Sequence, residues 1–400
     1  MPTTVAIPNQ SDPRLDAPMI AGRRQRPAAR ITRVEAIPLH VPFATPFRIA
    51  TGPARSVAEI MIVRLHTDVG IEGIGETQAW RRIGSDATLH SLTTEIRDLF
   101  APCVVGRSPF DAPAILRDCD KAASRASYAK AAVADALLDL QARLLEVPAW
   151  ALLGGRARAT VGACAVLPLA ETISLTVDAA LDFVAQGYRS ATLKVGVNAE
   201  DDIALVNRLR SEVPQLTLRP DANATLSVDS AARLIPALKD AGVEAIEQPL
   251  APDALEAMAE LTRRFDMPLI ADESVHTRED LLRVIAAGAA FGVQTKVAKN
   301  GGAWKTRTLW EIADAAGMHI YPGNHPATSV ATASVLQLAA AWPGELAEGP
   351  FAVGIAGSLA RDIVVEPLRV VHGQVAVPEG PGFGVMLDED AIASMRIDLG

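Results

Sequence analysis

The chain has 400 residues, of which 49% are hydrophobic and 21% are charged. This length exceeds that of a single ordinary domain, so we expect one large and one smaller domain with ample apolar material for a core. A formal net charge of −9 argues against a nucleic-acid partner, which would favour a basic face. No apolar run is long enough to cross a bilayer, so we expect no membrane partner.

Cysteines and the N-terminal stretch bear on where the protein acts. The three cysteines, at positions 103, 119 and 164, suit neither a disulfide framework nor a zinc site, and they predict a cytoplasmic protein with reduced thiols. Residues 1–29 are rich in proline, alanine and polar residues, with arginines at 23, 24 and 26. They lack the apolar stretch of a secretory signal, so we predict a disordered tail, with an organellar transit peptide as the alternative.

Residues 30–155 have the pattern of an α+β domain. Apolar alternation from Ile31 to Leu39, from Ile60 to Leu65 and from Ile71 to Ile74 predicts three antiparallel strands. From about Leu89 to Leu144 the apolar period becomes helical, and Gly154–Gly155 ends the run.

Residues 156–360 repeat one unit. Short β-type segments end near residues 166, 194, 221, 247, 272, 296, 321 and 348, so that consecutive ends lie 24–28 residues apart. Helical patterns lie between them at 201–210, 230–241, 254–265 and 304–316. Eight strand–helix units predict a (β/α)8 barrel, with an open doubly wound sheet as the alternative. We expect residues 361–400 to return to the N-terminal domain.

Acidic residues stand at the ends of three consecutive predicted strands. Asp221, Glu247 and Asp272 end the third, fourth and fifth strands, and barrel enzymes place their reactive groups at such ends. Three carboxylates at the barrel mouth would repel one another unless a cation neutralised them. A hard divalent ion with oxygen ligands fits best, so we predict Mg2+, with Mn2+ as an alternative, rather than three separate helix caps.

Lysines end the strands on either side of the acids. Lys194 ends the second predicted strand and Lys296 the sixth, so in a barrel of eight strands they face each other across the mouth. This arrangement suits removal and return of a proton next to a carboxylate through an enediolate, with a lysine whose pKa nearby cationic charge depresses acting as the base. We interpret Lys299, three residues further on, as structural.

The sequence resembles the muconate-lactonizing subgroup of the enolase superfamily over nearly all of residues 30–390. The matching pieces are Gly73–Ile–Gly–Glu–Thr, Leu152–Leu–Gly–Gly, Leu193–Lys–Val–Gly, Asp221–Ala–Asn, Glu247–Gln–Pro, Ala271–Asp–Glu–Ser, Lys296–Val–Ala–Lys–Asn–Gly–Gly and Pro381–Gly–Phe–Gly. The resemblance implies a capping domain over the barrel, Mg2+ on the three acids, acid/base roles for Lys194 and Lys296 on opposite faces of a small carboxylate substrate, and assembly as a homo-oligomer. It also implies that two cap loops, at residues 46–54 and after Glu76, shape specificity.

The candidate substrate-binding residues follow from this comparison and include its departures. They are Phe47, Ile49 and Trp80 in the cap, and Thr192, Asn223, Glu273, Asn324, His325 and Glu348 in the barrel. Thr192 stands where the family usually has a lysine, and Glu348 is the only acid left of an Asp-x-Asp pair found in related dipeptide racemases. His325 follows the seventh strand, where we expect it to bind substrate or donate a proton; the alternative is a histidine satisfied by backbone groups.

The leading hypothesis is therefore a metal-dependent isomerase, either a cycloisomerase or a racemase/epimerase, acting on a small carboxylate or amino-acid-like substrate. A dehydratase is the second reading, because the same enediolate can expel a β-hydroxyl from a hydroxylated acid such as a hydroxyproline. From other classes, a Schiff-base aldolase and a non-catalytic binding barrel remain as alternatives.

Overall fold

The computed structural model describes residues 28–48, 52–82, 85–167 and 169–399. The predicted N-terminal tail, apart from its last two residues, and the candidate residue Ile49 lie outside these ranges. No helix in the described ranges combines the length and the apolar character that a membrane span requires.

The first three long strands form the antiparallel sheet that the alternating pattern predicts. These are β1 (Ile31–Phe47), β2 (Arg55–Thr67) and β3 (Glu72–Gln78), in the order β1-β2-β3. Successive side chains of a strand point to opposite faces, and both faces of β2 are buried in hydrophobic cores. Ile60 and Ile62 enter the large core shared with the barrel, whereas Met61 and Val63 enter a separate core under the cap helices.

The cap helices pack on the second face of this sheet. They are α1 (Leu89–Thr94), a π-helical turn (Glu95–Phe100), α2 (Ala101–Val104), α3 (Ala112–Ala122) and α4 (Ser127–Leu144), with a 3-10 turn at Pro109–Asp111. The short helix α5 (Ala149–Leu152) follows and buries Ala149 in the core shared with the barrel. The central helix α4 lies directly on β3. A Cβ atom at Gly75 would come within 2.1 Å of the Ala132 carbonyl oxygen, so the glycines of the Gly73–Ile–Gly motif permit this close approach. A short hairpin of β4 (Arg81–Arg82) and β5 (Ser85–Asp86) follows β3.

Seven parallel strands build the barrel sheet, in the order β13-β12-β11-β10-β9-β8-β7. They are β7 (Ala165–Val166), β8 (Ser190–Lys194), β9 (Thr217–Asp221), β10 (Ile246–Glu247), β11 (Leu269–Ala271), β12 (Gly292–Lys296) and β13 (His319–Gly323). Sequential strands are neighbours throughout, which confirms the barrel-type reading over an open doubly wound sheet, whose strand order would reverse.

The eighth predicted strand, ending near Glu348, is not a regular strand. Its segment still bridges the two edges of the sheet: the Ala347 amide donates to the Ile320 carbonyl at 2.9 Å, and the Cys164 amide donates to the Gly349 carbonyl at 3.0 Å. A 3-10 turn (Pro350–Ala352) and a kinked π-type turn (Gly354–Ser358) follow. Gly349 approaches the Pro322 carbonyl so closely that a Cβ would clash at 1.8 Å. At this point the segment forms single hydrogen-bonded bridges to its neighbours and not a continuous ladder of strand hydrogen bonds.

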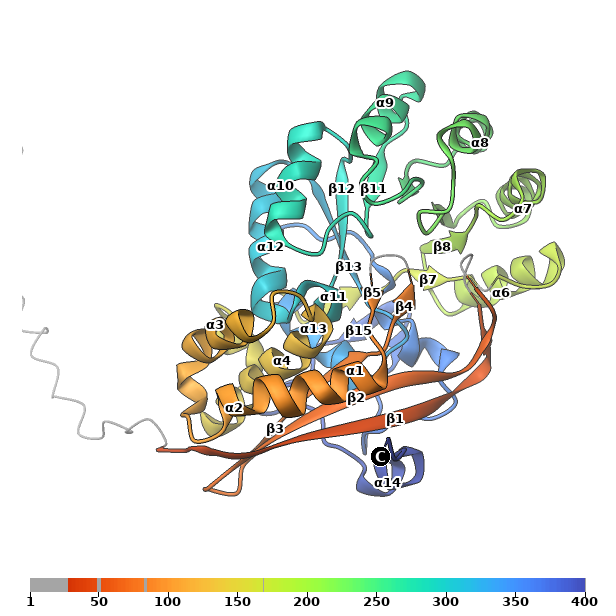
Figure 1. Ribbon diagram of the computed structural model, residues 1–400. Helices are drawn as coiled ribbons and strands as arrows, with labels where there is room; N and C mark the ends of the chain where they lie inside the picture. The colour runs from red at the N-terminus through yellow and green to blue at the C-terminus, as the bar shows by residue number, and fades with distance from the viewer. Residues whose placement is uncertain (1–27, 49–51, 83–84, 168, 400) are drawn as a thin grey trace, which may run out of the picture.

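Helices alternate with the strands and lie outside them (Figure 1). They are α6 (Ile173–Ala185), α7 (Ala199–Glu212), α8 (Val228–Asp240), α9 (Leu255–Phe265), α10 (Arg278–Ala287), α12 (Ala303–Ala315) and α13 (Ser329–Ala340), with a single turn α11 (Val297–Asn300) after β12. Every residue of α13 is buried, because this helix lies between the barrel and the cap.

The C-terminal residues attach to both domains. The strands β14 (Val370–Val371) and β15 (Gln374–Ala376) form a small sheet with β6 (Thr160–Gly162) at the start of the barrel. Further on, the Phe383 amide donates to Asp139 of α4 at 2.6 Å, and α14 (Glu389–Met395) ends where the Ile397 amide donates to the Pro38 carbonyl of β1. The tail thus ties the barrel to the cap.

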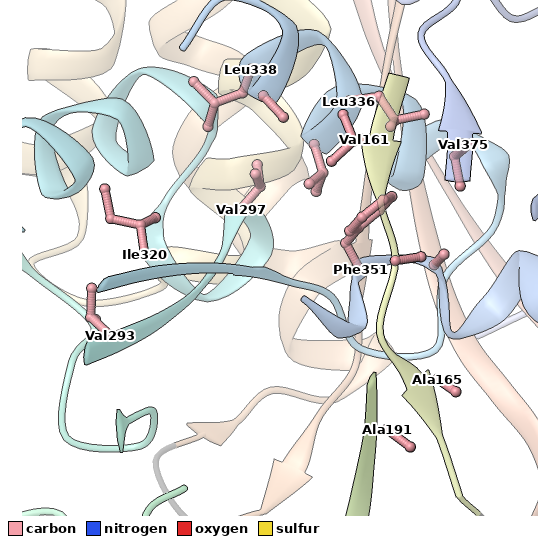
Figure 2. Close-up of a cluster of buried hydrophobic side chains, with 14 of the residues drawn as sticks. Val161, Ala165, Ala191, Val293, Val297, Ile320, Leu336, Leu338, Phe351 and Val375 are labelled. Atoms are coloured by element: carbon pink, nitrogen blue, oxygen red, sulfur yellow. The ribbon is translucent and has the colours of Figure 1, made fainter. Parts of the chain in front are cut away.

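Aliphatic side chains fill the space between the barrel strands, α13 and the C-terminal sheet. Figure 2 shows part of this core, where Phe351 lies beside Val161 and below Leu336, and Val293 and Ile320 come from adjacent strands. Continuous burial on both faces of the parallel strands gives the barrel the rigidity that fixed positions at its strand ends require.

Candidate active site

The three predicted acids lie together at the strand ends. Asp221 and Glu247 are register partners on β9 and β10, and Asp272 directly follows β11. Their exposed fractions are 1%, 0% and 2%. Burial first, and then the charges of Asp221 and Asp272, raise the pKa of Glu247 well above its usual range. The two aspartates therefore destabilise the charged form of Glu247, which is the kind of conflict the sequence predicts.

The two predicted lysines flank the acids. β8 and β12, which carry Lys194 and Lys296, enclose the three acid-bearing strands in the sheet order. Lys194 Nζ lies 2.5 Å from Asp221 Oδ2, and Lys296 Nζ donates to Asp272 Oδ2. Each lysine thus reaches the cluster from its own side.

The neighbouring carboxylates influence the pKa of both lysines. Burial alone would lower the pKa of both, but for Lys194 the charges of Asp221 and Glu247 outweigh burial and raise it. For Lys296, Asp272 and Glu247 do the same. Among the protein groups alone, the close carboxylates therefore favour the ammonium form, and the depression of a lysine pKa by nearby cationic charge stays a prediction.

Lys299 takes a larger part than the sequence indicated. Its side chain is buried, and Nζ donates to Asp272 Oδ1 at 2.6 Å and to the Gln294 carbonyl at 3.1 Å. Lys299 also lines the cavity. One turn of α11 returns the side chain toward the strand end, so the position three residues after Lys296 faces the acids instead of leaving with the loop.

Two glutamine side chains that the sequence analysis did not single out hold the acids in place. Gln248 accepts from the Asp272 amide at 2.9 Å and donates to Ser274 Oγ at 2.8 Å. Gln294 Nε2 donates to Glu247 Oε1 at 2.6 Å. The Glu247–Gln–Pro motif contains the first of these, but nothing in the sequence separates Gln294 from an ordinary core residue of β12.

The donor set suits a hard divalent cation. Glu247 Oε2, Glu273 Oε2 and Asn223 Oδ1 are buried oxygen atoms without a hydrogen-bond partner, and carboxylate and amide oxygens are what Mg2+ prefers. Within the described ranges, no three His, Cys, Asp or Glu side chains are drawn together tightly enough to form a metal site as they stand. Lys194 and Lys296 instead turn their ammonium groups onto Asp221 and Asp272.

A cavity at the strand ends collects most of the predicted substrate-binding residues. The predicted residues that line it are Phe47, Trp80, Thr192, Asn223, Glu273, Asn324 and His325, and the lining residues that the sequence did not indicate include Val166, Tyr128, His276, Gln294 and Val353. Thr192 is fully buried with Oγ1 3.6 Å from Cys164 Sγ, so it brings no charge to the cavity.

Glu348 is the predicted residue that the structure places elsewhere. Its Oε2 accepts from Ser190 Oγ at 2.7 Å, and it does not line the cavity. Ser190 begins β8, whereas Lys194 ends it. The Glu348 carboxylate therefore lies near the first residue of β8, whereas the acids and lysines lie at the C-terminal ends of their strands. The irregular backbone of the closing segment accounts for this shift.

Cap and barrel meet over His325. Its ring stacks on Trp80 at 4.3 Å and on Tyr128 at 5.7 Å between centroids, and Arg55 lies over Trp80. Burial and the charge of Lys296 lower the pKa of His325 well below its usual range, so the imidazole is neutral. Nδ1 is buried without a hydrogen-bond partner, which contradicts the alternative that backbone groups satisfy this ring.

Family comparisons agree with this geometry. Residues 31–154 match the mandelate racemase / muconate lactonizing enzyme N-terminal domain, and residues 175–391 match the enolase C-terminal domain-like family. Muconate cycloisomerase 1 of Rhodococcus opacus is 34% identical over 90% of this chain and 97% of its own. N-succinyl-L-Arg/Lys racemase of Bacillus cereus is 27% identical over 92% and 98%. The crystal structure of 2-chloromuconate cycloisomerase from Rhodococcus opacus 1CP superimposes with a TM-score of 0.88 at 30% identity and covers 92% of this chain and all of its own.

Proposed function

Because the chain belongs to the mandelate racemase / muconate lactonizing enzyme family of the enolase superfamily, we propose that it is a Mg2+-dependent isomerase that removes a proton next to a substrate carboxylate. The observation that carries this proposal is the order of groups across the barrel mouth. Lys194 and Lys296 enclose Asp221, Glu247 and Asp272, which occupy the three strand ends between them.

Asp221, Glu247 and Asp272 would hold the cation, and the buried unpartnered oxygen of Glu247 supports this assignment. A bound dication stabilises the negative charge that builds up on a substrate carboxylate as its α-proton leaves. The same charge would compete with the lysines for the acids. Without their carboxylate partners, buried lysines lose the interaction that raises their pKa, so they become better bases.

The lysines would then act on opposite faces of the substrate. One takes the α-proton and the other returns a proton to the opposite face in a racemisation or epimerisation, or to another carbon in a cycloisomerisation. The substrate would be a small carboxylate or an amino-acid-like compound. Relatives named for muconate and for N-succinylated arginine or lysine represent these two kinds of reaction.

Dehydration of a hydroxylated acid is the second candidate, and two observations favour it. Thr192 replaces a lysine that the family usually has at this position, and Asn324 and His325 present neutral polar groups to the cavity. The Schiff-base alternative would need one lysine but not the three acids that lie between Lys194 and Lys296, so the geometry gives it no support.

Deuterium uptake tests the proposal. The protein would be incubated in D2O with Mg2+ and N-acyl amino acids, dipeptides, hydroxyprolines or muconates, and the α-position followed by NMR. We expect uptake with at least one class and its loss in EDTA, with recovery on adding Mg2+. Uptake that persists in EDTA would contradict the metal requirement, and borohydride-trapped adducts would instead support a Schiff base. The quaternary structure, which we expect to be a homo-oligomer, can be measured on the same sample by light scattering.

A further inference from the structure

Two neighbouring residues on the β13 side of the cavity have buried polar atoms without hydrogen-bond partners. Asn324 and His325 directly follow β13, and each is 5% exposed. Asn324 Nδ2 and His325 Nδ1 are both buried without a hydrogen-bond partner. A buried polar group that lacks a partner costs about as much as a lost hydrogen bond, so two adjacent ones at the wall of a cavity indicate that a ligand supplies the partner.

The charges around these atoms limit what the ligand can be. Among the described residues that line the cavity, the cationic ones are Lys194, Lys296 and Lys299. All three are hydrogen-bonded to Asp221 or Asp272, and Thr192 adds no charge. Asn324 and His325, whose polar atoms lack partners, are themselves neutral, so a second carboxylate placed against them would have no cation among its direct hydrogen-bond partners, and burying an unpaired charge is costly.

Asn324 and His325 suit a neutral group better. Asn324 Nδ2 can only donate, whereas the imidazole of His325, held neutral by burial, offers a donor or an acceptor according to its tautomer. A hydroxyl group can accept from the first and donate to the second, and it fits either tautomer. A carboxylate accepts only.

Stacking fixes the orientation of the imidazole. The planes of His325 and Trp80 lie at 26°, and those of His325 and Tyr128 at 21°. Both aromatic residues come from the cap, so the cap orients this barrel residue. A group whose orientation is fixed before binding discriminates between ligands better than a mobile one.

We propose that Asn324 and His325 form a subsite that binds a hydroxyl group of the substrate. This inference rests on the proposed function, because it places a hydroxylated monocarboxylate at the acid and lysine cluster. It gives the substrate a chemical class: one carboxylate for the cluster and one neutral hydroxyl directed toward β13, rather than two carboxylates.

Matched ligand pairs test the subsite. Affinities for proline against 3-hydroxyproline, and for N-acetylalanine against N-acetylserine, would be measured by calorimetry on the Mg2+-loaded full chain, with cis,cis-muconate as the dicarboxylate. We expect at least one hydroxylated member to bind at least tenfold more tightly than its partner and than muconate. His325→Phe, which keeps a stacking ring, and Asn324→Ala should each reduce this preference about tenfold. His325→Gln should retain part of it.

His319→Phe is the control, because His319 begins β13, the strand that His325 follows, but is exposed and outside the cavity; the preference should not change. Failure of the hydroxylated ligands to bind, tighter binding of muconate, or an unchanged preference in His325→Phe would each overturn the subsite. Deuterium uptake without hydroxyl preference would overturn it while leaving the proposed function in place. Hydroxyl preference without any uptake would overturn the proposed function alone.

Discussion

Glu76 of the cap strand β3 accepts hydrogen bonds from the first turn of barrel helix α13: the Thr328 amide donates to Oε1 at 3.0 Å and the Ala331 amide to Oε2 at 2.9 Å. The first amides of a helix have no partner within it, and here the other domain supplies one. Asn324 and His325 come shortly before Thr328 in the sequence, so the contact between Glu76 and Thr328 also helps to position the side of the cavity that these two residues form.

Glu76→Ala should therefore lower the free energy of unfolding by about 2–4 kcal/mol, because it leaves two buried amides without partners. Urea denaturation followed by circular dichroism measures the change. The control is Glu72→Ala on the same strand, where the side chain is 42% exposed and only forms surface ion pairs, worth about 0–1 kcal/mol. Equal losses in the two variants would show that the contact across the domains contributes nothing special.

Lys194 and Lys296 should divide the two faces of the substrate between them. We expect Lys194→Ala to abolish α-hydrogen exchange from one stereoisomer and Lys296→Ala from the other, each by a factor of about 10²–10⁴. NMR in D2O with resolved stereoisomers provides the measurement, and Lys305→Ala, on the exposed face of α12, should behave as wild type. The two-base assignment fails if both variants keep equal exchange from both isomers.

Glu247→Gln should separate metal binding from folding. Mg2+ should raise the melting temperature of the wild type, since a ligand at a hundred times its Kd stabilises the fold by about 2.7 kcal/mol. In the variant this rise should disappear. Without Mg2+, however, the variant should be at least as stable as the wild type, because burial and two neighbouring acids penalise the Glu247 carboxylate. Glu279→Gln, on an exposed residue of α10, serves as control; a retained Mg2+ response in Glu247→Gln would remove Glu247 from the ligand set.

Asp135 should give the protein a stability loss between about pH 4 and pH 6. Burial first, and then the charge of Asp139, raise the pKa of this α4 carboxyl to about 6, against the hydrogen bonds from Ser334 and the Ala303 amide. The folded state then holds a proton that the unfolded state has released, so stability is fully present below the unfolded pKa and falls as pH rises through the folded pKa. Two units correspond to about 3 kcal/mol.

Asp135→Asn should remove that contribution, because an amide can keep both hydrogen bonds without ionising. The measurement is the difference between the two urea-denaturation profiles from pH 4 to pH 7, which cancels the other buried carboxyls. Asp266→Asn, whose side chain is 98% exposed, should leave the profile unchanged. Parallel profiles for wild type and Asp135→Asn would contradict the assignment.

Strand ends could be predicted from the sequence because spacing and chemistry agreed. The acids and lysines recur once per strand–helix unit, and a parallel barrel brings such positions to one edge. Those predictions required no knowledge of loop conformation. The antiparallel cap sheet followed in the same way from the alternation of apolar residues.

Positions that depend on irregular backbone could not be predicted. Glu348 lies on the segment that closes the barrel, and Gly349 crowds against Pro322 there, so strand counting placed its carboxylate at the wrong level. Lys299 enters the site because a single helical turn reverses the chain. Tyr128 reaches His325 from a cap helix about 200 residues away in the sequence, and no local pattern encodes such a meeting.

The division of β2 between two cores has a consequence for how this protein can be taken apart. A chain cut near residue 155 would leave the barrel fragment without Ile60 and Ile62, and the cap fragment with both of them bare. Each piece would carry a newly exposed apolar face, so we expect neither to stay monomeric in solution. The two domains that match separate sequence families thus share one hydrophobic core in this molecule, to which β1, β2, β3 and α4 of the cap all contribute.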